Sequence, residues 1–108
     1  ERGLVIRGNF FMKIKITQHM QLADFNNGWT TISKTFTSNI IPHKGDLLMD
    51  TFWKDPYEYE VTEVTISYQF DECYVSVKPL VIRSNKKDVL IKYIEKAKLA
   101  GWESSLEI

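Results

Sequence analysis

Residues 59–78 decide the fold class, and they read YEVTEVTISYQFDECYVSVK. Apolar side chains occupy every second position on either side of one interruption, at Val64, Ile66, Tyr68, Phe70, Cys73, Val75 and Val77. This period of two is typical of strands with one buried face. Asp71 and Glu72 interrupt the pattern, so the stretch predicts an antiparallel hairpin. Asp-Glu is not a favoured two-residue turn, and a bulge or a longer loop is therefore expected there.

Further strands are predicted on both sides of this hairpin. Lys13–Thr17 alternates cleanly, the turn signal at residues 26–28 follows it, and Trp29–Thr37 is rich in threonine and aromatic residues. A break at Pro42 and Gly45 then separates that strand from a short buried strand over Leu47–Met49. After the hairpin, residues 80–82 are expected to add a short edge strand.

The apolar period changes to the helical one near residue 83. Leu90, Ile94 and Ala97 form a stripe at helical spacing, which predicts one amphipathic helix over residues 85–100. We expect Asn85 to cap its first turn, with Asp88 three residues further on. Gly101 suits the position just after the helix.

This order of elements predicts a mainly β domain with one C-terminal helix, either a small barrel or a strongly bent antiparallel sheet that the helix closes. The pattern Pro42-x-x-Gly45-Asp46, Tyr59-x-Val61-x-x-Val64 and Val75-x-Val77 resembles that of SH3-like small barrels. Residues 12–108 are expected to form one domain. Residues 1–11 are interpreted as a vector-derived leader, an upstream start or a first strand through residues 4–6, and the sequence leaves these alternatives open.

Composition limits the function classes. The 108 residues carry no formal net charge, which disfavours a dedicated nucleic-acid binder. Cys73 is the only cysteine, so no disulfide framework is available and a reducing, cytoplasmic location is expected. No apolar run approaches the ~18 residues that a membrane span needs, so no membrane partner is expected.

No pattern in the sequence predicts a catalytic, cofactor or metal site. Cys73 with His19 or His43 would be a nucleophile and base, but Cys73 falls on the apolar face of the hairpin, where a thiol is inert. His19, His43, Asp24 and Asp46 lack metal-ligand spacing. The carboxylates of residues 46–63 suit a solvated surface better than an acid–base pair. Enzymatic activity is therefore disfavoured, although a site that assembles only in three dimensions stays open.

Two features point to binding. Residues 83–98 carry a net charge of +4 and residues 46–63 a net charge of −5, so the chain is polarised along its length. The loop over residues 52–57 contains three rings, a composition found in interface hot spots. The candidate partner-binding residues are Phe52, Trp53, Tyr57, Lys86, Lys92 and Lys96.

We therefore expect a small non-catalytic binding module that engages a protein partner, or a second copy of itself, through the aromatic loop and the strand edges. The alternative is a nucleic-acid-binding small barrel, and the third hypothesis is a small-ligand-binding or hydrolytic barrel with a pocket under the helix. If the loop anchors a partner, Trp53 and Tyr57 should be exposed. If it instead covers the core, Trp53 should be buried.

Overall fold

The computed structural model describes residues 11–54 and 56–105. The proposed leader therefore lies outside the described residues, except for Phe11. The elements in chain order are β1 (Met12–Gln21), the 3₁₀ turn η2 (Phe25–Asn27), β2 (Trp29–Ser38), β3 (Leu47–Met49), β4 (Glu58–Ser67), β5 (Glu72–Val77), β6 (Leu80–Val81), α1 (Lys87–Leu99) and β7 (Glu103–Ser104). None of the described helices has the length and apolar character needed to cross a bilayer.

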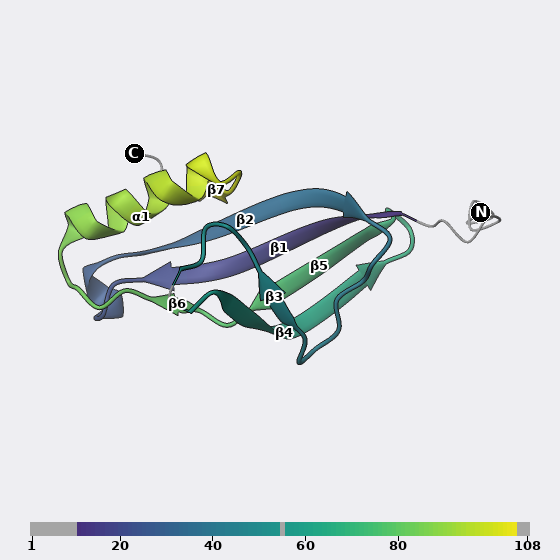
Figure 1. Ribbon diagram of the computed structural model, residues 1–108, viewed down its shortest axis with the longest axis horizontal. Helices are drawn as coiled ribbons and strands as arrows, with labels where there is room; N and C mark the ends of the chain where they lie inside the picture. Colours follow the sequence, from purple (N-terminus) through teal and green to yellow (C-terminus); the bar gives the residue numbers. More distant parts are fainter. Residues whose placement is uncertain (1–10, 55, 106–108) are drawn as a thin grey trace.

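The strands form one open sheet with the order β3-β4-β5-β1-β2-β7, and β6 also pairs with β1 (Figure 1). Neighbouring strands are antiparallel except at β1, which runs parallel to both β5 and β6. The expected mainly β class with one C-terminal helix is confirmed. The expected antiparallel pairing holds between β1 and β2 but is wrong where β1 meets β5 and β6, and the sheet is not closed into a barrel.

The parallel pairing follows from how the chain returns to β1. After β2, the chain crosses to form the β3–β4 and β4–β5 hairpins, and β5 then comes back beside β1 in the same direction. A central strand with one parallel and one antiparallel neighbour is common in mixed sheets. In this order β3 and β7 are the two edge strands of the sheet.

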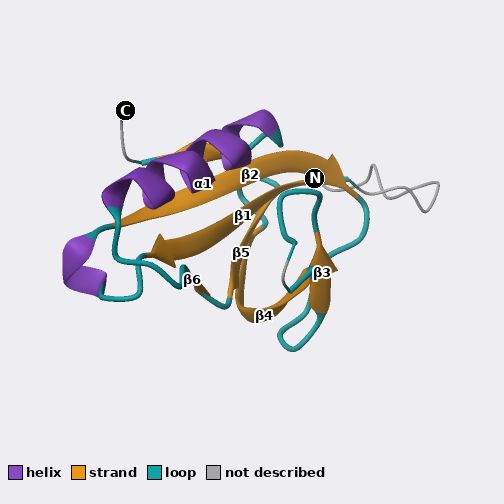
Figure 2. Ribbon diagram, turned by 60° about the vertical axis from the view of Figure 1, so that its left-hand side comes forward, coloured by secondary structure: helices purple, strands orange, loops and turns teal. Residues whose placement is uncertain are grey.

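The core lies between one face of the sheet and α1 (Figure 2). Alternate side chains of β1 point into it, namely Met12, Ile14, Ile16, Gln18 and Met20. Leu90, Ile94 and Ala97 face it from α1, which confirms the predicted stripe. Lys13 and Lys15, the residues between them on β1, are exposed on the opposite face of the sheet.

Two local expectations need correction. The 59–78 hairpin does have a longer turn, over residues 68–71 with Asp71 at a φ of 55°, so Tyr68 and Phe70 are exposed turn residues and do not continue the strand face. The helix begins at Lys87 and Asn85 does not cap it. The Asn85 side chain instead accepts a hydrogen bond of 2.7 Å from the backbone N–H of Asp24.

Candidate functional site

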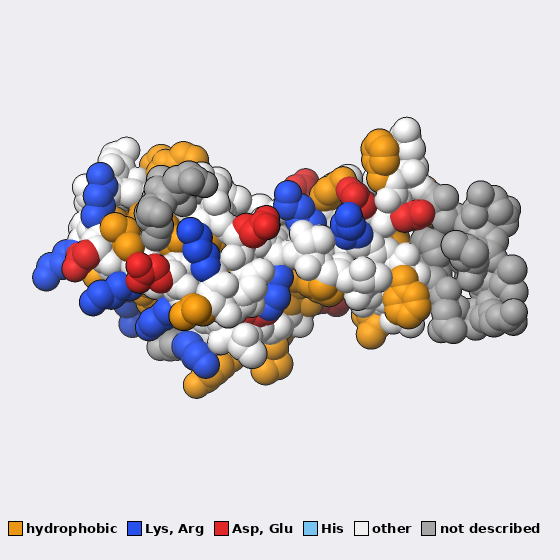
Figure 3. Space-filling model, turned by 90° about the horizontal axis from the view of Figure 1, so that it is seen from above, with side chains coloured by type: hydrophobic (Ala, Val, Ile, Leu, Met, Phe, Trp, Pro, Cys, Tyr) orange, Lys and Arg blue, Asp and Glu red, His pale blue; other side chains and the backbone are white. Residues whose placement is uncertain are grey.

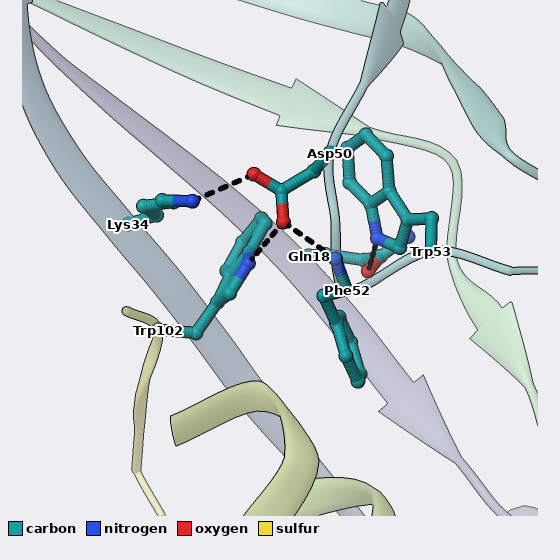
Figure 4. A network of polar contacts seen from close by, with 6 residues as sticks. All are labelled: Gln18, Lys34, Asp50, Phe52, Trp53 and Trp102. Carbon is teal, nitrogen blue, oxygen red and sulfur yellow. Dashed lines mark hydrogen bonds and ion pairs between the residues drawn. The ribbon is translucent and has the colours of Figure 1, made fainter. Parts of the chain in front are cut away.

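A carboxylate holds the loop after β3 in place (Figure 4). The Asp50 side chain accepts hydrogen bonds from Lys34 Nζ at 2.7 Å, from Trp102 Nε1 at 2.9 Å and from the backbone N–H of Phe52 at 3.0 Å. Lys34 belongs to β2 and Trp102 follows α1. One side chain therefore joins the loop to the sheet and to the end of the helix.

The charge of Asp50 is stabilised by these partners. Burial alone would raise the pKa of its carboxyl group, but the hydrogen bonds from Lys34, Trp102 and Phe52 and the charge of Lys34 outweigh burial. The pKa therefore lies below its ordinary value of 3.8. The network is in its ionised, fully bonded form at neutral pH.

Trp53 belongs to the core. Its side chain is 2% exposed, and its indole N–H donates to Gln18 Oε1 at 3.0 Å. Gln18 in turn donates to the backbone carbonyl of Lys78 at 2.9 Å, so the buried amide is satisfied on both sides. The indole packs against the rings of Tyr59 and Trp102, with centroids 4.9 Å and 5.7 Å away. The exposure that a partner-binding Trp53 requires is absent.

The buried loop forms one wall of a pocket of about 250 Å³. The loop contributes Phe52, Trp53 and Lys54, β4 contributes Tyr59, the β6 segment contributes Leu80, Val81 and Arg83, and α1 contributes Tyr93 and Lys96. A second hollow of about 330 Å³ shares Phe52, Lys54 and Lys96 with the first and extends to Leu99 and Ala100. The pocket thus combines aromatic walls with three cationic side chains.

These three cations have no acidic partner among the described residues. The ion pairs found there involve Lys13, Lys34, His43 and Lys78, and none of the described Asp or Glu residues lines the pocket. Figure 3 shows Lys and Arg side chains gathered at the α1 end of the molecule. Three like charges that line one hollow favour a positive local potential there, although the chain has no formal net charge.

The structure brings together some of the predicted binding residues and separates others. Phe52, Trp53 and Lys96 line the same pocket, whereas Tyr57, Lys86 and Lys92 are exposed outside it. Sequence reasoning missed Lys54, Tyr59, Arg83 and Tyr93. Tyr93 and Lys96 lie three residues apart on the predicted helix, and this spacing was a usable signal. Nothing local in the sequence indicates that Tyr59 and Arg83 meet them.

Comparison of the chain with protein-family models, with curated proteins and with solved structures finds no match. The resemblance to SH3-like barrels is accordingly not confirmed.

The other candidate groups are dispersed. Cys73 is fully buried in β5, and burial raises the pKa of its thiol. His19 stacks with Phe25 and lies tilted against Trp29 on the sheet face opposite α1, while His43 lies in the exposed loop before β3. Within residues 11–54 and 56–105, no group of three His, Cys, Asp or Glu side chains is arranged to hold a metal ion.

Proposed function

We propose that the protein is a small binding domain whose pocket takes an organic anion with a planar or aromatic body. One observation carries this proposal: Lys54, Arg83 and Lys96 line the same pocket as several aromatic rings. None of the three cations has an acidic partner among the described residues. The sequence alone favoured a protein partner over a small ligand. The burial of Trp53 and the pocket support a small ligand instead.

The pocket chemistry supports this ligand class. A carboxylate, sulfonate or phosphate group would accept charge-assisted hydrogen bonds from Arg83 and Lys96. The ring of the ligand would pack against Tyr59 and Tyr93 and replace contacts with water. Pockets for drug-sized molecules measure roughly 300–1,000 Å³, so a smaller hollow suits a ligand of one or two rings. The Asp50 network keeps the loop wall in position before the ligand arrives.

A matched pair of probes tests the proposal. Naphthalene-1-sulfonate is titrated into the protein by isothermal calorimetry, with the neutral naphthalene-1-sulfonamide as its control. The sulfonate should bind and the sulfonamide should bind at least tenfold more weakly, because a charged hydrogen bond contributes about 1.5–3 kcal/mol. Equal affinity for the two probes would rule out the role assigned to the cations.

Matched variants locate the binding site. Lys96→Gln and Arg83→Gln should each weaken sulfonate binding by about tenfold. Lys15→Gln makes the same change of charge on the opposite face of the sheet and should leave the affinity unchanged. A thermal melt of each variant checks that it is folded. If Lys15→Gln weakened binding as much as Lys96→Gln, the effect would be one of overall charge and the pocket would not be the site.

Nucleic acid is the alternative ligand for the same basic end of the molecule. A single-stranded oligonucleotide that displaces the sulfonate, with an affinity that falls steeply as salt rises, would replace the small anion as the ligand.

A protein partner, including a second copy of the chain, is a second candidate function. The observation that favours it is the outer edge of β2, which over residues 34–38 pairs with no strand of the described chain; such an edge can accept an added strand. The cytoplasmic location also stays a proposal, supported by a single free cysteine held inside the core.

A further inference from the structure

Among the residues that the structure describes, no strand pairs with the outer edge of the C-terminal half of β2. On this side β2 pairs with β7 only at Ile32 and Ser33, and the backbone N–H of Ser105 donates to the carbonyl of Thr31 at 2.9 Å. From residue 34 to residue 38, no strand in the described part of the chain pairs with this edge (Figure 1). Within residues 11–54 and 56–105, the free segment is therefore five residues long.

The backbone of this segment is oriented for pairing. The carbonyl of Thr31 points outward to Ser105, away from β1. In an antiparallel ladder the direction of the backbone groups alternates along the strand. Thr35 and Thr37, which lie an even number of residues from Thr31, therefore present their N–H and C=O groups to the free edge, and Phe36 directs its own groups to β1.

The devices that usually protect an edge strand are missing here. Residues 35–38 are Thr, Phe, Thr and Ser, with no charge, no proline and no break in their register with β1. The neighbouring Lys34 is held by Asp50 at 2.7 Å, so its charge is directed inward. Thr35 and Thr37 are exposed, and the ring of Phe36 is 41% exposed.

We propose that this edge of β2 pairs with the same edge of a second copy of the chain. This inference rests on the second candidate function, binding of a protein partner through a strand edge. The pairing is antiparallel about a two-fold axis at Phe36, so that Phe36 lies opposite Phe36 of the partner subunit and Thr35 lies opposite Thr37 of the partner subunit. The two sheets then form one continuous sheet across the axis.

The free segment suits a second copy better than an unrelated strand. Phe36 is the midpoint of the five free residues, so a two-fold pairing uses the whole segment and stops where β7 begins to cover β2. The Thr35–Thr37 pairs are the hydrogen-bonded pairs of the new ladder. The Phe36 rings meet at its closer, non-hydrogen-bonded position, where cross-strand aromatic pairs are favourable. No like charges oppose each other within residues 35–38.

Sedimentation velocity over a series of concentrations tests the pairing. The wild-type chain should form a dimer in the micromolar to millimolar range, as expected for a small interface. Thr35→Lys/Thr37→Lys places like charges opposite each other and should give a monomer throughout. Thr35→Lys/Thr37→Glu places opposite charges across the same pairs and should restore the dimer. A wild-type chain that stays monomeric at millimolar concentration, or a dimer that Thr35→Lys/Thr37→Lys leaves intact, would overturn the proposal.

A peptide separates this inference from the broader function. A labelled peptide with the sequence of residues 33–39 is titrated into the wild-type chain and into Thr35→Pro, which removes one outward N–H and leaves the ladder with β1 intact. A monomeric chain that binds the peptide, with Thr35→Pro abolishing that binding, would show that the edge accepts an added strand although two whole chains do not pair; this outcome overturns the pairing and keeps the strand-addition function. A monomeric chain that does not bind the peptide would remove both the pairing and the strand-addition function.

Discussion

Trp53 is a core residue although the loop that contains it has the composition of an interface. Phe52 and Trp53 follow a short strand in a segment rich in charge, and the sequence offers no period from which their burial follows. In the folded chain Gln18 supplies a hydrogen-bond acceptor for the indole, and two further rings surround it. A satisfied indole N–H removes the polar cost of burying tryptophan.

Truncation of this residue should therefore act on stability. Trp53→Ala is expected to lower the free energy of unfolding by about 3–5 kcal/mol, because a large buried side chain and the partner of Gln18 are lost. Tyr57, whose ring is 64% exposed, is the control from the same loop. Tyr57→Ala should change stability by less than about 0.5 kcal/mol. Urea titrations followed by circular dichroism measure both, and equal effects would refute the burial of Trp53.

At the scale of elements, α1 begins without a side-chain cap. Lys86 occupies the N-cap position with extended backbone angles, φ −86° and ψ 126°, and makes no capping hydrogen bond through its side chain. Asn85, the better capping residue, is engaged by the backbone of Asp24 and so joins the η2 region to the start of the helix. The helix is stabilised by its buried stripe, since packing can compensate for an uncapped end.

Introducing a cap at this position should stabilise the protein. In Lys86→Ser the hydroxyl group can accept from the backbone N–H of Asp88 or Val89, and a cation is removed from the positive end of the helix dipole. The expected gain is about 1 kcal/mol in the free energy of unfolding. Lys92→Ser changes an exposed residue in the middle of α1. It should instead lower the free energy of unfolding by a few tenths of a kcal/mol, because serine is a weaker helix former than lysine. Melting temperatures measured for both variants check this prediction. A change of the same sign in both variants would contradict it.

At the scale of the whole molecule, Asp50 joins three parts that are distant in sequence. Its partners are Lys34 in β2, Phe52 in the loop and Trp102 after α1. The same carboxylate therefore holds both the loop wall of the pocket and the end of the helix that covers the core. Its loss is expected to loosen the pocket as well as to destabilise the fold.

The stability of the protein should depend on the ionisation of this carboxyl group. The pKa of Asp50 is lower in the folded chain than its ordinary value of 3.8. The stabilising contribution of the ionised carboxylate is therefore complete above about pH 5. It declines as the pH falls through the ordinary pKa of 3.8 and is lost as the pH falls through the lower pKa of the folded chain. Asp50→Asn should cost about 1.5–3 kcal/mol at pH 7 and progressively less as the pH falls below 4. Urea titrations at several pH values measure this, with Glu95→Gln on the exposed face of α1 as control. A cost that did not change with pH would exclude a contribution from the charge.

Local patterns in the sequence predict the main strands and the helix of this protein. The alternation in residues 59–78 and 13–17 predicted β4, β5 and β1, and the helical stripe at Leu90, Ile94 and Ala97 predicted α1 and the face that it buries. These patterns are readable because the periods of strand and helix are set by the backbone of a few consecutive residues.

The way in which these elements combine cannot be derived from local patterns. The parallel pairing of β1 with β5, the open sheet and the pocket all depend on contacts between distant parts of the chain. Trp53 meets Gln18 across 35 residues, and Trp102 meets Asp50 across 52. No local period specifies such a contact, because it depends on which strand edges and helix faces the folded backbone brings together. The core role of Trp53 and the convergence of Lys54, Arg83 and Lys96 arise in this way, from packing between elements.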